Sequence, residues 1–136
     1  MDAKAKLLLV DDEPLVLRSL QKTLLRAGYE VETASNCTDS LETFETAQGS
    51  DTPFDLAILD LNMPGFDGAH AAGAGLELLS RLVEHQPDLP VVVLTAYDEV
   101  GKAKGAVDRG ARSYFVKGRE GGLVDLIDDI LGFVRK

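Results

Sequence analysis

The chain has 136 residues, a net charge of −9 at neutral pH and a single cysteine, Cys37. This length fits one domain with one hydrophobic core, and the composition is that of a folded globular protein. The negative charge argues against a nucleic-acid-binding surface, which needs clustered Lys and Arg, and one cysteine excludes both an internal disulfide and a cysteine-based zinc site.

Nothing in the sequence indicates a membrane or an export signal. No apolar run approaches the roughly 18 residues of a membrane span, and residues 1–6 lack the apolar core of a signal peptide. The low cysteine content favours a reducing, cytoplasmic setting. Cys37 lies in a polar stretch, and we expect no special role for its thiol.

Strand and helix patterns alternate along the whole chain. Short apolar or alternating runs predict five strands, at residues 6–10, 29–34, 57–59, 90–95 and 113–116. Helical spacing of apolar residues predicts five helices, at residues 14–27, about 39–47, 76–86, 98–109 and 120–134. Pro14 suits the first position of its helix and Gly28 its end, while Thr38 or Asp39 is expected to cap the second helix.

This alternation predicts an α/β fold with a parallel sheet, right-handed crossovers and helices on both faces. We expect a three-layer flavodoxin-like (βα)5 sandwich with strand order 2-1-3-4-5, in which the third strand lies beside the first. No repeat or linker divides the chain, so residues 1–136 are expected to form a single domain.

The stretch at residues 54–65 is the most informative one. Its apolar run ends on Asp60, and Pro64-Gly65 predicts a turn, so residues 60–63 are expected on a loop at the carboxyl end of the third strand. Ligands bind at this edge of an open parallel sheet. A lone Asp at a strand end is more often only a turn former, so the side chains at the neighbouring strand ends decide the interpretation.

Those neighbours carry chemistry of one kind. The polar side chains expected at this edge are Asp11, Asp12, Asp60, Thr95 and Lys117. Individually, Asp12 could cap a helix, Thr95 could be an ordinary strand-ending residue, and Lys117 could be a solvated surface lysine. Together, three carboxylates repel one another unless a cation joins them, and an all-oxygen set suits Mg²⁺. With Lys117 opposite, they form a site for a dianionic phosphoryl group, in which an ionised Asp can act as nucleophile and give an acyl phosphate.

Four segments resemble a known family at this point. Residues 9–14, 59–65, 94–96 and 114–117 resemble the signature blocks of the receiver domain of two-component response regulators, the chemotaxis-regulator-like domain. The blocks occur in the family's order, and the resemblance covers residues 6–134.

The resemblance implies a role for each polar residue of the site. Asp60 would be the phospho-acceptor. Asp12 and Asp60 would bind Mg²⁺ (or Mn²⁺) directly, Asp11 would act mainly through water, and the backbone carbonyl of Asn62 would be a further ligand. Lys117 would contact the phosphoryl group.

The resemblance also implies a conformational switch and a tuned lifetime of the phosphoryl group on Asp60. Thr95 would move toward the phosphoryl oxygens, and Tyr114 would turn inward to fill the vacated space. Asn62 and Tyr97 would flank the phosphoryl group and set its rate of hydrolysis, with the bulky Tyr97 shielding it from water.

The implied partners are proteins. A histidine kinase or His phosphotransfer protein would donate the phosphoryl group. A downstream protein or output domain would read the state on the face formed by the fourth helix, fifth strand and fifth helix, where a homodimer on phosphorylation is a further outcome. The domain would catalyse only its own phosphotransfer and autodephosphorylation, and we expect no DNA-binding or catalytic output segment within residues 1–136.

Two departures from the family pattern stand out. Gly118 follows Lys117 where the family has Pro, often with a cis bond, so a trans bond or a rearranged loop is expected. About seven extra residues, 69–75, follow the acceptor loop. A flexible loop, an extra helical turn and a lid that contacts a partner or ligand remain open for this insertion, and His70 is its only reactive side chain.

Two other classes compete with the receiver interpretation. A pseudo-receiver would act as a phosphorylation-independent interaction module, but such domains typically lack the acid pocket. A haloacid-dehalogenase-type phosphatase would carry its nucleophile after the first strand, with a second Asp two residues on, whereas here Asp60 follows the third strand and Asn62 occupies that position.

Overall fold

The computed structural model describes residues 4–61, 74–96, 99–118 and 120–133. Within these ranges, five strands alternate with five helices: β1 (Lys6–Val10), α1 (Pro14–Arg26), β2 (Glu30–Ala34), α2 (Cys37–Gln48), β3 (Leu56–Asp60), α3 (Ala74–His85), β4 (Val91–Thr95), α4 (Val100–Asp108), β5 (Ser113–Val116) and α5 (Glu120–Leu131). The sheet is wholly parallel with order β2-β1-β3-β4-β5, and the predicted flavodoxin-like fold is confirmed.

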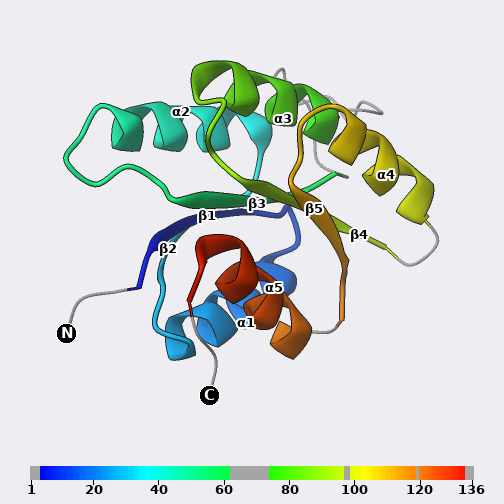
Figure 1. Ribbon diagram of the computed structural model, residues 1–136, viewed down its shortest axis with the longest axis horizontal. Coiled ribbons are helices and arrows are strands. Elements are labelled where there is room, and N and C mark those ends of the chain that lie inside the picture. The colour runs from blue at the N-terminus through cyan, green and yellow to red at the C-terminus, as the bar shows by residue number, and fades with distance from the viewer. Residues whose placement is uncertain (1–3, 62–73, 97–98, 119, 134–136) are drawn as a thin grey trace.

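The sheet lies between two layers of helices. Helices α2, α3 and α4 cover one face and α1 and α5 the other (Figure 1). The three central strands are buried on both faces, which explains their uninterrupted apolar sequences. Alternate residues of one strand therefore belong to different cores: Leu59 packs toward α2 and α3, and Ile58 packs toward α1 and α5.

Several element boundaries differ from the sequence predictions. Asn36, and not Thr38 or Asp39, caps α2, because its side-chain oxygen accepts a hydrogen bond from the Asp39 amide at 2.8 Å. Asp60 is the last residue of β3 and does not lie on the following loop. The alternation of Tyr29, Val31 and Thr33 with Glu30 and Glu32 predicts Thr33 on the buried side of the second strand, but Thr33 is exposed.

Other boundaries follow the prediction. Pro14 is the first residue of α1, and Gly28, just beyond its end, has φ +100°, a conformation that glycine adopts without steric cost.

Cys37 begins α2 and is buried. Burial, with the nearby Glu77 carboxylate, raises the pKa of its thiol to about 11, which makes it a poor nucleophile.

A buried polar contact that the sequence did not indicate links both ends of the domain. The Tyr29 hydroxyl donates to Asp128 on α5, and the Lys4 ammonium lies 3.0 Å from the same carboxylate oxygen. Burial and the Asp128 charge raise the pKa of the Tyr29 phenol, so it remains a neutral donor. The contact ties the start of the chain to α5.

Candidate functional site

The carboxyl ends of neighbouring parallel strands meet at one edge of the sheet, and polar residues follow each of them. Asp11 and Asp12 come directly after β1, Asp60 and Thr95 end β3 and β4, and Lys117 follows β5. Backbone hydrogen bonds to neighbouring strands hold two of these residues in place: the Asp11 amide donates to the Ala34 carbonyl at 3.2 Å, and the Lys117 amide donates to the Thr95 carbonyl at 3.0 Å. The pairing of the strands thus fixes the backbone from which these side chains project.

Three carboxylates lie together at this edge. Asp11, Asp12 and Asp60 each offer an oxygen, and these oxygens lie within 4.8 Å of one another. Asp11 is 0% exposed and Asp60 is 2% exposed, while Asp12 is half-buried. Acidic groups this close and this buried need a positive charge beside them.

Lys117 supplies one such charge. Its ammonium lies 3.1 Å from Asp60 Oδ2, 3.2 Å from Asp11 Oδ2 and 3.6 Å from Glu13 Oε1. Burial by itself lowers the pKa of this ammonium, but the charges of Asp60 and Asp11, together with the hydrogen bond to Asp60, outweigh burial and raise it. Lys117 is therefore a cation throughout the physiological pH range.

One oxygen of the cluster has its hydrogen bonding incomplete. Asp11 Oδ1 accepts from the Glu13 amide at 2.9 Å. Asp11 Oδ2 is buried and makes no well-oriented hydrogen bond, although the Lys117 ammonium is its ion-pair neighbour. A buried carboxylate oxygen with spare capacity beside two other carboxylates fits a hard divalent cation, directly or through bound water. The residues present therefore fit the predicted Mg²⁺ site.

Thr95 and Tyr114 lie on the same face of the sheet. Val93 pairs with Tyr114 and Thr95 with Val116. Thr95 is therefore the diagonal neighbour of Tyr114, two residues beyond its direct partner on the adjacent strand. Thr95 is buried, and its hydroxyl donates to the Ala96 carbonyl at 3.1 Å. Tyr114 is half-buried and packs against the core beneath α2, α3 and α4.

Gly118 has a backbone conformation closed to the residue that the family usually carries. Its φ is +102°, whereas proline is fixed near −65°. The described residues contain no cis peptide bond, as expected from the missing proline. Glycine at this position is therefore part of how the chain turns after Lys117.

Several predicted site residues cannot be placed. Asn62, Tyr97 and His70 lie outside the described residues, as do residues 69–73 of the predicted insertion. Its last two residues, 74 and 75, are the first residues of α3, which begins two residues before the predicted start at Leu76.

Sequence reasoning missed two features beside the site. Glu13 is not among the predicted site residues, yet its carboxylate Oε1 lies 3.6 Å from the Lys117 ammonium. An apolar hollow of about 250 Å³ also adjoins Lys117. It is lined mainly by α1, including the 78% exposed Leu15, with single residues from β4, β5 and α5. The exposed leucine in the first turn of α1 was the available signal.

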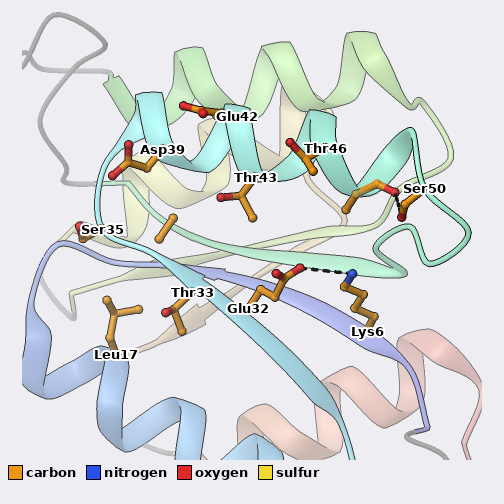
Figure 2. Close-up of a pocket in the computed structure, with 12 residues that line it drawn as sticks. Lys6, Leu17, Glu32, Thr33, Ser35, Asp39, Glu42, Thr43, Thr46 and Ser50 are labelled. Carbon is orange, nitrogen blue, oxygen red and sulfur yellow. Dashed lines mark hydrogen bonds and ion pairs between the residues drawn. The ribbon is translucent and has the colours of Figure 1, made fainter.

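A larger hollow, of about 670 Å³, lies elsewhere, between β2 and α2 (Figure 2). Its lining is mostly polar and includes Glu32 of β2 and Asp39, Thr43 and Thr46 of α2. Lys6 projects into it but is held by Glu32 at 3.2 Å. Its lining contains none of Asp11, Asp12, Asp60, Thr95 and Lys117, so it is separate from the carboxylate cluster.

Fold and site together define an α/β domain of the flavodoxin-like class with an acidic, lysine-bearing centre at the carboxyl edge of its sheet. Residues 7–128 match the family described as response regulator receiver domain. The chain belongs to this family, the receiver domains of two-component systems.

Curated relatives agree with this assignment. The chain is 36% identical over 116 residues to the C4-dicarboxylate transport transcriptional regulatory protein DctD of Pseudomonas aeruginosa, covering 85% of this chain and 22% of the relative. It is 38% identical over 112 residues to the response regulator MprA of Mycobacterium ulcerans, covering 82% and 43%. The chain thus spans less than half the length of these relatives.

Solved structures agree as well. A response regulator receiver domain protein from Clostridium thermocellum superimposes with a TM-score of 0.81 at 29% identity, covering 94% of each chain. NtrX from Brucella abortus, in complex with ADP, gives a TM-score of 0.78 at 26% identity, covering 96% of this chain and 27% of that one. Among the described residues, no helix is both long enough and apolar enough to cross a membrane.

Proposed function

We propose that this domain receives a phosphoryl group on Asp60 and relays that event to a partner protein. The observation that carries the proposal is the meeting of Asp60, Asp11 and Lys117 at one sheet edge, with Nζ–O distances of 3.1 and 3.2 Å. Family membership supports the same role, because the chain matches receiver domains over residues 7–128. The domain would catalyse only its own phosphotransfer and autodephosphorylation.

The transfer would be an in-line displacement at phosphorus. An Asp60 carboxylate oxygen attacks, a new P–O bond forms, and the P–N bond of the donor phosphohistidine breaks, its electron pair going to the imidazole nitrogen. Lys117, held charged by the acidic residues around it, offsets the negative charge on the transferring group. Burial of Asp60 would limit the water that competes with its carboxylate as the nucleophile toward phosphorus.

A divalent ion would complete the site. Asp11, Asp12 and Asp60 would hold Mg²⁺ (or Mn²⁺), with the backbone carbonyl of Asn62 as a further ligand. The ion would neutralise phosphoryl oxygens as charge shifts between donor and acceptor. The buried Asp11 Oδ2, which accepts no well-oriented hydrogen bond and has only the Lys117 ammonium as ion-pair neighbour among the described residues, and the all-oxygen donor set support this assignment.

Phosphorylation of Asp60 would change the conformations of Thr95 and Tyr114. In the structure the Thr95 hydroxyl donates to a backbone carbonyl, and a phosphoryl dianion on Asp60 would offer it a stronger, charged acceptor. Because Tyr114 lies one diagonal step away on the same face, it would fill the space that Thr95 leaves. This is a population shift between two packings, biased by one new dianion.

Two protein partners are part of the proposal. The phosphodonor, a histidine kinase or His phosphotransfer protein, would dock on the apolar hollow beside Lys117, with the exposed Leu15 as a contact. Docking there would bring its phosphohistidine close to Asp60. A downstream protein or output domain, or a second copy of the chain, would read the α4-β5-α5 face in a cytoplasmic setting, without nucleic acid contact by this domain.

Intact-mass measurement after incubation with acetyl phosphate tests the proposal. We expect the native chain to gain one phosphoryl group with Mg²⁺ and none with EDTA. Asp60→Asn should abolish the gain, while Asp55→Asn, an exposed carboxyl just before β3, should leave it unchanged. No gain by the native chain, with Mg²⁺ binding confirmed, would refute the proposal and favour a phosphorylation-independent interaction module.

A further inference from the structure

Gly75 lies in the first turn of α3, tightly against the end of β3. A Cβ atom at this position would lie 2.6 Å from Leu61 Cα, 2.7 Å from the Leu61 carbonyl oxygen and 2.9 Å from the Asp60 carbonyl oxygen. Ordinary contact begins at about 3.4 Å. All three neighbours are backbone atoms of the proposed acceptor segment, so no side-chain rotation can make room.

The requirement for glycine here is spatial and not conformational. Gly75 is not among the glycines with positive φ, which are Gly28, Gly110, Gly118 and Gly132. By contrast, a Cβ at Gly101 or Gly105 of α4 would meet nothing within 4 Å. The chain therefore has helical glycines that tolerate alanine and one whose missing side chain lets a helix touch the acceptor strand.

We propose that Gly75 is a positioning residue of the phosphoryl-acceptor site. This inference rests on the proposed function. By letting the first turn of α3 pack on the backbone of Asp60 and Leu61, Gly75 determines how far the end of β3 can move. The Asp60 carboxylate, which must stay within reach of Asp11 and Lys117, depends on that backbone.

The contact also bears on the metal site. Asp60 is itself a proposed Mg²⁺ ligand, so a displaced acceptor backbone would weaken Mg²⁺ binding as well as attack on phosphorus. Reactive geometry is sensitive to displacements of this size, since about 1 Å can cost on the order of a hundredfold in rate. Packing alone would change stability and leave both properties intact.

The test compares Gly75→Ala with Gly101→Ala and Gly105→Ala, the same chemical change where space is free. We expect Gly75→Ala to slow acetyl phosphate-driven phosphorylation at least about tenfold, to weaken Mg²⁺ binding severalfold, and to shift the Asp60 and Leu61 amide resonances of the metal-free protein. The two controls should leave all three unchanged. If Gly75→Ala does not fold alone, it is measured in the Gly101→Ala, Gly105→Ala background, where the gain in helix propensity offsets the loss.

Each outcome decides the inference. A Gly75→Ala protein that is less stable but binds Mg²⁺ and takes up phosphate like the native chain would overturn it, while leaving the proposed function in place. A native chain that takes up no phosphoryl group would refute the proposed function, and with it the role assigned to Gly75. Loss of rate and of Mg²⁺ affinity in Gly75→Ala alone would support it.

Discussion

Replacing Lys117 with methionine removes the cation of the acidic cluster while keeping a side chain of similar length. Its ammonium lies within 3.6 Å of Asp60, Asp11 and Glu13, and its side chain is only 23% exposed. Breaking a buried ion pair by removing one partner costs about 3–5 kcal/mol. Because Lys117 keeps some contact with water, we expect the lower end, a loss of about 3 kcal/mol in the free energy of unfolding.

Urea unfolding in EDTA and in saturating Mg²⁺ measures this effect. In EDTA the full deficit should appear, because the buried carboxylates then have lost their ammonium neighbour. In Mg²⁺ the deficit should shrink by at least about 1 kcal/mol. The site of the variant is more negative, so it should bind the dication more tightly than the native site and gain more stability by mass action. Lys102→Met is the control: Lys102 is 58% exposed and pairs only with Glu99 in the described structure, so we expect a change under about 0.5 kcal/mol.

The pH dependence of the same deficit gives an independent check. The pKa of Lys117 is raised in the folded state, so its stabilising contribution is complete below the unfolded value, about 10.4, and is lost as pH rises through the higher folded value. Native and Lys117→Met proteins should therefore differ by a constant amount from neutral pH to about 10. A deficit equal in EDTA and Mg²⁺, or one that fades well below that pH, would refute the electrostatic account of the site.

Two further predictions follow from local geometry, and a third follows from the family resemblance. Gly118→Pro, which brings the sequence closer to the family pattern, should cost more than about 1 kcal/mol in urea unfolding and slow phosphorylation, because proline cannot adopt φ +102° next to Lys117; Gly118→Ala should be milder. Asn36→Ala should lower the free energy of unfolding by about 1 kcal/mol through loss of the α2 cap, without changing the phosphorylation rate; a neutral stability effect would contradict the cap assignment. Tyr97→Ala should speed loss of phosphate from the phosphorylated domain, followed by intact mass over time, and an unchanged rate would end the shielding hypothesis.

The fold could be predicted because its signals are local and repeated. Each buried strand is a short apolar run, each helix has an apolar face, and their alternation leaves one plausible layer arrangement. The polar residues of the site could be found for a related reason. In a parallel sheet the strand ends share one edge, so Asp60 and Lys117, 57 positions apart in sequence, were expected together and lie 3.1 Å apart.

Contacts set by tertiary packing could not be predicted in the same way. Asn36, Thr38 and Asp39 all have side chains able to cap α2, and only the backbone geometry selects Asn36. Thr33 continues a strand alternation, but it lies near the end of the edge strand β2, and its side chain is exposed.

Close approaches are equally invisible in a sequence. Gly75 is one of 13 glycines, and nothing in its sequence neighbours distinguishes a contact with Leu61 from a flexible linker. The Tyr29–Asp128 pair joins residues 99 positions apart. The sequence predicts that a helix covers the sheet there, but not which side chains of the helix meet those of the strands. The Lys117–Glu13 contact depends on how the chain turns after β1.

The most direct test of the central claim is to locate the phosphorylated residue chemically. Borohydride reduces an acyl phosphate to the alcohol and releases phosphate, so it converts a phosphorylated aspartate into homoserine. After treatment with acetyl phosphate and Mg²⁺, we expect homoserine at Asp60 in peptide mass mapping. Homoserine at Asp11 or Asp12, with Asp60 unchanged, would contradict it.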